Sequence, residues 1–168
     1  MDEAGLYSKF VEILLGCDFD RKYYAYCERH REGGWKLAAW LEPAKEALAP
    51  HLEFKYQKKE QFFQCREAFV GGEFKLHLSL KPPTAEWGLY VRVGEEAVGG
   101  PFTVLARTVG KRRDPGFSPD PPAPRPRLSN PEQMKLVVTE GLALFEDVKK
   151  AVVAYDWKAL AEASGGMT

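Results

Sequence analysis

Apolar and polar residues alternate through the middle third of the chain. The clearest stretch is residues 73–81, in which every second side chain is apolar and the side chains between are polar or charged. A period of two predicts a β-strand with one buried face and one face turned to solvent. The apolar positions are Phe74, Leu76, Leu78 and Leu80, and the polar positions are Lys75, His77, Ser79 and Lys81. We therefore expect an antiparallel sheet over residues 52–109.

The register of the first strands follows from two turns. The first predicted turn places Tyr56 opposite Phe63. The second, at residues 71–72, consists of two glycines, which tolerate the positive φ of a tight hairpin, and places Phe69 opposite Phe74. Both turns put the same apolar side chains on one face. Because a slip of one residue would turn these side chains to solvent, the agreement supports the predicted faces.

Helical periodicity replaces the alternation on either side of the sheet. Apolar residues recur every three or four positions over residues 3–15 and 20–31, which predicts two helices. A third pattern covers residues 35–48, where Pro43 predicts either a kink or a new helix that begins near Glu42. Asn130, followed by a proline and two acidic or amide residues, is typical of a helix start.

The remaining segments complete a predicted α+β fold. Residues 87–93 and 102–109 supply the fourth and fifth strands, and residues 110–130 hold six of the twelve prolines, which predicts a stiff, extended connector. We expect one domain of residues 1–168, with a long C-terminal helix packed on a five-stranded meander. Its parts are helices in 1–50, sheet in 52–109, Pro-rich crossover in 110–130 and C-terminal helix in 131–163.

Composition narrows the classes of function. Twenty-four Lys and Arg balance twenty-four Asp and Glu, so no net field attracts nucleic acid or an anionic membrane, and we expect neither partner. No apolar run approaches the roughly 20 residues of a membrane span, and no signal segment is visible. With three cysteines, an odd number, the chain is expected to be cytoplasmic and to keep reduced thiols.

Sequence motifs of catalysis are missing. The chain has no phosphate loop, dinucleotide fingerprint, Gly-x-Ser-x-Gly elbow, His-Glu-x-x-His or Cys-x-x-Cys pair. Cys27 and His30 are three residues apart on a predicted helix, but a four-ligand zinc site normally shows two such pairs. We therefore predict no metal, no cofactor and no catalytic residue.

The polar face of the sheet is the leading candidate site. The register places Glu53, Arg66 and His77 in one cross-strand row, and Tyr90 and Arg92 share their face. Arg and Tyr are common anchors of protein interfaces, although an ordinary solvated face fits the same pattern. The leading hypothesis is a non-catalytic interaction module, of the inhibitor, immunity-type or adaptor kind, that binds a protein through this face or the connector. The sequence leaves the oligomeric state open.

A second hypothesis depends on Glu67, which the register places on the apolar face between Leu52 and Leu76. Such a carboxylate either lies at the sheet margin or is a buried acid with a raised pKa. In the latter case a small-molecule-binding or enzymatic cavity would lie between the sheet and the aromatic helices. Its predicted lining is Glu67, Tyr23 and Trp40.

Overall fold

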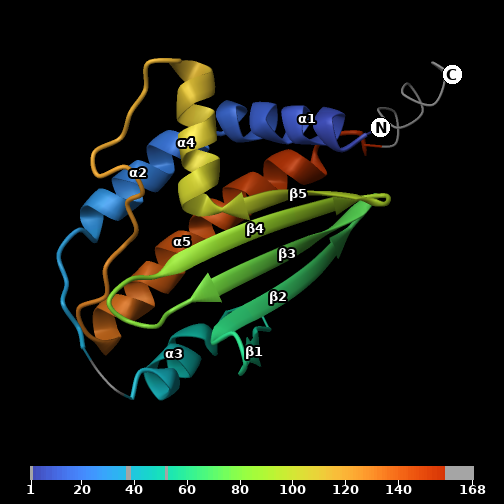
Figure 1. The fold of residues 1–168 in the computed structure, drawn as a ribbon. Coiled ribbons are helices and arrows are strands. Elements are labelled where there is room, and N and C mark those ends of the chain that lie inside the picture. Colours follow the sequence, from blue (N-terminus) through green and yellow to red (C-terminus); the bar gives the residue numbers. More distant parts are fainter. Residues whose placement is uncertain (1, 37–38, 52, 158–168) are drawn as a thin grey trace, which may run out of the picture.

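The chain folds as an α+β protein, as predicted. The computed structural model describes residues 2–36, 39–51 and 53–157, and within them five helices and one five-stranded antiparallel sheet are present (Figure 1). The elements are α1 Glu3–Gly16, α2 Phe19–Arg29, α3 Leu41–Leu48, β1 Lys55–Gln57, β2 Phe62–Phe69, β3 Gly72–Ser79, β4 Glu86–Val93, β5 Glu96–Pro101, α4 Phe102–Arg113 and α5 Pro131–Val153. None of these helices is both long and apolar enough to cross a membrane.

The sheet is a meander with the strand order β1-β2-β3-β4-β5, and helices pack against one of its faces. Figure 1 shows α5 crossing behind the sheet, while the face turned to the viewer has no covering helix. On the covered face, Phe74 meets Phe145 of α5 edge to face, and Trp87 stacks on Phe102 of α4. The hydrophobic core therefore lies between the sheet and the helices, and none of the described helices packs on the opposite face.

The predicted register is correct at the first hairpin and wrong at the second. Tyr56 pairs with Phe63, as predicted, but Phe69 pairs with Gly72 rather than with Phe74. The turn consists of Val70 and Gly71, and only Gly71 has a positive φ, of 101°. A Cβ atom on Gly72 would overlap its neighbours, with the Phe69 ring only 2.7 Å away. The predicted pairing of β2 with β3 is shifted by two residues, an even number, so each side chain still lies on its predicted face.

The fifth strand lies earlier in the chain than predicted. Residues 102–109 belong to α4, and β5 is Glu96–Pro101. Phe102, Leu105, Ala106 and Val109 are buried and follow helical spacing, so the apolar residues of this segment share one helical face. The strand itself escaped prediction because it contains two glycines. Gly99 has a φ of 139° and lies against the β4 backbone, which leaves no room for a side chain.

Most of the predicted helix ends agree with the structure. Pro43 lies in the first turn of α3, so the chain starts a new helix there rather than kinking an old one. Asn130 caps α5, where its side chain accepts a hydrogen bond of 2.9 Å from the Gln133 amide. α5 ends at Val153, before the predicted 163, and positions 158–163 lie outside the described residues, as does Leu52.

The connector between α4 and α5 is attached to the body of the protein. We call residues 124–128 the strap, because backbone hydrogen bonds join them to the end of α2 and to the loop between β3 and β4. Thr84 and Arg127 also form an isolated antiparallel bridge. The backbone bonds are Arg127 N to His30 O (2.7 Å), Leu128 N to Pro83 O (2.8 Å), Ala85 N to Pro126 O (2.9 Å) and Trp35 N to Leu128 O (3.2 Å).

Candidate functional site

Three aromatic rings lie side by side on the open face of the sheet. Phe62, His77 and Tyr90 project from β2, β3 and β4, and all three are partly exposed. The ring centroids of Phe62 and His77 are 4.5 Å apart, and those of His77 and Tyr90 are 5.0 Å apart. Gly88 stands opposite His77, and a Cβ atom there would be in ordinary contact with the Tyr90 ring, at 3.4 Å. We refer to these three side chains as the aromatic row.

Two arginines flank the aromatic row and share one carboxylate. Arg66 of β2 and Arg92 of β4 each donate to the same Glu73 oxygen, at 3.1 Å. Their side chains are 53% and 52% exposed. Ion pairs as exposed as these stabilise a fold by at most about 1 kcal/mol. Their effect is therefore mainly to hold two guanidinium groups in place, with further N–H donors facing solvent.

His77 is a neutral ring at pH 7. Burial, together with the charges of Lys75 and Arg66, lowers its pKa from the ordinary 6.5. Its Nε2 atom is shielded from solvent and has no hydrogen-bond partner among the described residues. Lys75 lies over the Tyr90 ring, with its Nζ 5.4 Å from the ring centroid. The aromatic row itself is thus uncharged, and Arg66, Lys75 and Arg92 place positive charge beside it, toward the β2–β3 turn.

Four of the five predicted surface residues meet here. Arg66, His77, Tyr90 and Arg92 lie on the open face, whereas Glu53 is exposed just before β1, outside the paired strands. The predicted row of Glu53, Arg66 and His77 is wrong, because Arg66 pairs with Lys75 and His77 pairs with Gln64. Phe62 and Glu73 were not predicted as parts of this surface, and Lys75 was predicted on the polar face but not as a site residue. Alternation alone places them there, because every even-numbered residue of β2 and β4 and every odd-numbered residue of β3 faces the same way.

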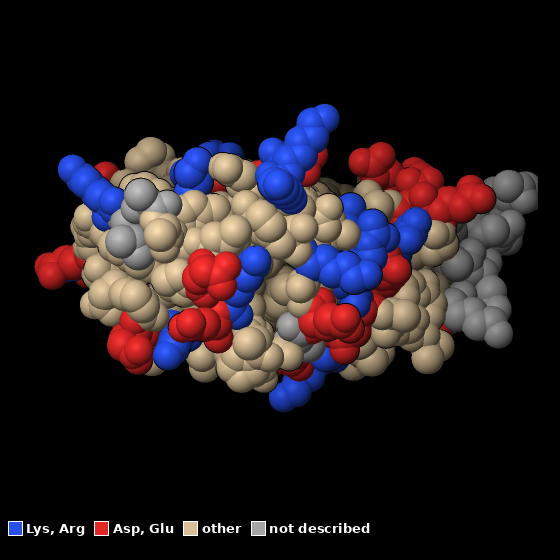
Figure 2. Space-filling model, turned by 90° about the horizontal axis from the view of Figure 1, so that it is seen from below, with Lys and Arg blue, Asp and Glu red and all other residues tan. Residues whose placement is uncertain are grey.

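The surface charges elsewhere are mixed. In the view from below, Lys and Arg side chains lie beside Asp and Glu side chains (Figure 2). This distribution agrees with the formal net charge of zero.

The residues of the predicted cavity lie apart from one another. Glu67 is at the sheet margin, where its carboxylate accepts a hydrogen bond of 2.9 Å from Lys149 of α5. Tyr23 is buried, and its hydroxyl donates to the Pro124 carbonyl at 2.8 Å. Trp40 instead packs on the edge of β1. The three side chains contact different parts of the fold and do not line a common cavity.

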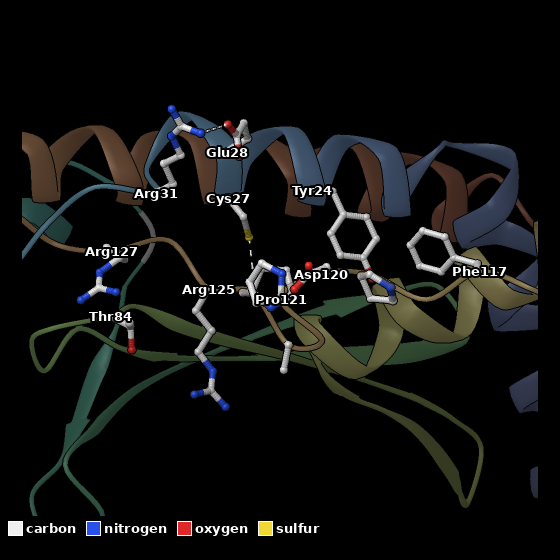
Figure 3. A pocket seen from close by; sticks show the side chains of 13 residues that line it. Tyr24, Cys27, Glu28, Arg31, Thr84, Phe117, Asp120, Pro121, Arg125 and Arg127 are labelled. Carbon is white, nitrogen blue, oxygen red and sulfur yellow. Dashed lines mark hydrogen bonds and ion pairs between the residues drawn. The ribbon is translucent and has the colours of Figure 1, made fainter.

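A groove of about 780 Å³ runs between α2, the connector and the loop after β3 (Figure 3). Tyr24 and Cys27 form its α2 wall, and the Cys27 thiol donates to the Pro124 carbonyl at 3.6 Å. Burial raises the pKa of Cys27 to about 12, so this thiol stays protonated and unreactive at neutral pH. The described residues contain no group of three or more potential metal ligands.

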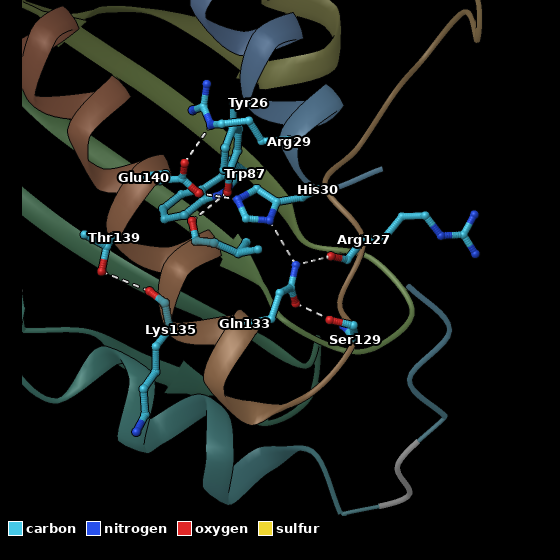
Figure 4. A network of polar contacts seen from close by, with 11 residues as sticks. Tyr26, Arg29, His30, Trp87, Arg127, Ser129, Gln133, Lys135, Thr139 and Glu140 are labelled. Atoms are coloured by element: carbon cyan, nitrogen blue, oxygen red, sulfur yellow. Dashed lines mark hydrogen bonds and ion pairs between the residues drawn. The ribbon is translucent and has the colours of Figure 1, made fainter. Parts of the chain in front are cut away.

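A network of polar contacts centres on His30 (Figure 4). The ring Nε2 contacts Glu140, and Nδ1 lies 3.1 Å from the Gln133 amide nitrogen. Gln133 also donates to the Arg127 carbonyl at 2.7 Å and accepts from the Ser129 amide at 2.9 Å, which fixes its amide orientation. Nδ1 must therefore accept, and the ring proton lies on Nε2. Because both ring nitrogens are engaged, His30 links the end of α2 to α5 and has no free ring nitrogen for base catalysis.

A second part of the network is fully buried. The Tyr26 hydroxyl donates to the Val137 carbonyl at 2.6 Å and accepts from the Trp87 indole at 3.1 Å. Burial raises the pKa of Tyr26 well above its ordinary value of 10, so it remains a hydroxyl. These contacts join α2, α5 and β4.

Comparison of the chain with protein-family models, with curated proteins and with solved structures gave no match.

Proposed function

We propose that the protein is a non-catalytic interaction module, of the adaptor or inhibitor kind, that binds another protein through the open face of its sheet. The observation that carries this proposal is the aromatic row, with Arg66 and Arg92 beside it, on a face that none of the described helices covers. Aromatic and Arg side chains are enriched in protein interfaces, where they supply large contact areas and several hydrogen bonds.

Charge on this face favours an acidic partner. Among the strand residues that face outward, four are Lys or Arg and two are Glu. Glu73 is engaged by two arginines, and Glu86 is paired with Arg125 of the connector at 3.3 Å. The four cations are Lys55, Arg66, Lys75 and Arg92. A partner with exposed Asp or Glu beside an apolar patch would complement both parts of the surface.

We favour protein over nucleic acid as the partner. Nucleic-acid platforms use aromatic rings that each stack on a separate base, within a positive field. Here the three rings contact one another, and the chain has a formal net charge of zero. We also propose a cytoplasmic location, which the three free cysteines support.

The test is affinity capture from the source cell, with the purified protein as bait and mass spectrometry as readout. The variant Arg66→Glu/Arg92→Glu reverses both charges on the face, and Lys111→Glu/Arg112→Glu makes the same charge change on exposed residues of α4. We expect the wild type and the α4 variant to retain a stoichiometric protein partner, and the sheet variant to lose it while keeping its circular dichroism spectrum.

Two outcomes would contradict the proposal. In the first, the sheet variant is folded and retains every partner of the wild type. In the second, nucleic acid rather than protein copurifies with the bait.

A further inference from the structure

We propose that the groove in Figure 3 is a second binding site, which takes a small organic oxyanion: a carboxylate or phosphate ester that carries an aromatic ring. Its volume of about 780 Å³ lies within the usual range for small-molecule sites. The groove has a cationic end on the strap and an aromatic end near α4. This proposal is independent of the open sheet face.

The cationic end contains two arginines and a hydroxyl group. Arg125 and Arg127 are two residues apart on the extended strap and both line the groove, and Thr84 pairs with Arg127 across the bridge (Figure 3). The Arg127 side chain has no ion pair or hydrogen bond within the described part of the chain. Arg125 uses one nitrogen for Glu86, so most of its N–H donors are free. Guanidinium groups with free N–H donors suit the oxygens of a carboxylate or phosphate.

The other end offers ring surfaces. Tyr24 and Phe117 lie with their ring centroids 5.5 Å apart, next to the prolines of the connector. Phe117 packs directly on Gly110 of α4, where any side chain would displace it. The ring is therefore held by its packing, and a planar apolar group can lie against it.

Tyr24 adds a polar contact that the protein itself leaves unused. Its hydroxyl is shielded from solvent and has no hydrogen-bond partner among the described residues. Burial, with a smaller effect from the Asp20 charge, raises its pKa to about 12, so it is a donor at neutral pH. A shielded polar group without a partner is unusual in a folded protein, and a ligand in the groove would supply an acceptor.

The acidic residues of the groove do not cancel this preference. Glu28 is held by Arg31 at 2.9 Å. Asp120 lies beside Pro121, toward the aromatic end (Figure 3). It disfavours a second negative charge there, so the ligand should carry its oxyanion at one end only.

The test is a ¹H–¹⁵N NMR titration with phenyl phosphate, benzoate and inorganic phosphate. We expect phenyl phosphate, benzoate or both to shift the amide signals of Tyr24, Phe117 and Arg127 saturably, and inorganic phosphate to bind at least about tenfold more weakly because it lacks the ring. The two ring compounds distinguish a phosphate site from a carboxylate site. The proposal is wrong if neither shifts these signals at about 10 mM, the weak limit of specific binding, or if inorganic phosphate binds as tightly as they do.

Arg127→Ala gives the matching variant, because the contacts of Arg127 with the fold are through its backbone. It should weaken binding about tenfold or more, the usual effect of losing charge-assisted hydrogen bonds. Arg112→Ala removes the same group from α4 outside the groove and should leave binding unchanged. Equal affinity of Arg127→Ala and the wild type would contradict the proposal.

Discussion

At the scale of single residues, Gly141 shows how tightly α5 fits the sheet. A Cβ atom at this position would overlap the indole ring of Trp87, whose Nε1 would lie only 2.8 Å away. The indole cannot move easily, because it stacks on Phe102 and donates to the Tyr26 hydroxyl. We therefore expect Gly141→Ala to lower the free energy of unfolding by about 3 kcal/mol, measured by urea denaturation.

Gly16→Ala is the control for that substitution. Gly16 is also helical, at the end of α1, and a Cβ atom there has no neighbour within 4 Å. The higher helix propensity of Ala should leave stability unchanged or raise it by up to about 1 kcal/mol. Similar losses in both variants would show that the contact with Trp87 is not the cause.

The pKa of Glu140 links stability to pH. Partial burial raises this pKa, but the hydrogen bonds from His30 and Arg29 outweigh it, and the pKa lies below the ordinary 4.5. A lowered folded-state pKa stabilises the protein above pH 4.5, and this contribution disappears as the pH falls through the folded value. Glu140→Gln should cost about 1–3 kcal/mol at pH 7, and the cost should shrink below pH 4.5.

Urea denaturation at several pH values measures this effect. Glu132→Gln is the control, because Glu132 is 84% exposed near the start of α5 and, among the described residues, pairs with Lys135 alone. It should change stability by no more than about 0.5 kcal/mol. A cost for Glu140→Gln that is the same at pH 7 and in acid would contradict the linkage.

At the scale of elements, the partly unpaired edge of β2 gives Glu67 a physical role. β1 pairs with residues 62–64 only, so among the described residues positions 65–69 of β2 pair with β3 alone. Charges on the inward side of an edge strand hinder pairing with another molecule. Glu67, held by Lys149 at 2.9 Å, is such a charge.

Replacing Glu67 should therefore promote self-association. We expect Glu67→Leu to sediment as dimers or larger species with increasing concentration, and Glu46→Leu, which adds the same apolar group to an exposed position of α3, to behave as the wild type does. Identical sedimentation of Glu67→Leu and the wild type at every concentration would contradict this role.

The strands also show which features of the fold can be predicted from a single sequence. Alternation predicted the faces of β2 and β3 correctly, because a face depends only on odd or even position. It did not predict the pairing, because Gly71 and Gly72 offer two turns that leave the same faces buried. The strand at Glu96–Pro101 lacks the large side chains that make a strand recognisable, although the helical spacing of Phe102, Leu105 and Val109 was visible.

At the scale of the whole molecule, the candidate sites differ in how predictable they were. The residues of the open face lie on consecutive strands, so local alternation brought most of them together. The groove and the His30 network join α2 to residues about a hundred positions later, as in the hydrogen bond from Tyr23 to Pro124. No local pattern contains such contacts, so the sequence predicted an extended connector but not where it attaches to the rest of the fold.

The strap allows a test of this long-range architecture with two neighbouring glycines. A Cβ atom on Gly33 would lie 2.7 Å from the Leu128 carbonyl oxygen and 3.0 Å from the Arg127 Cβ, whereas one on Gly34 has no neighbour within 4 Å. We expect Gly33→Ala to push the strap away, to cost about 1–3 kcal/mol, and to speed hydrogen exchange at the Arg127 and Leu128 amides. Gly34→Ala should match the wild type in both measurements. Because these amides bond to His30 and Pro83, unchanged exchange in Gly33→Ala would mean that the strap does not hold the end of α2 to the loop after β3.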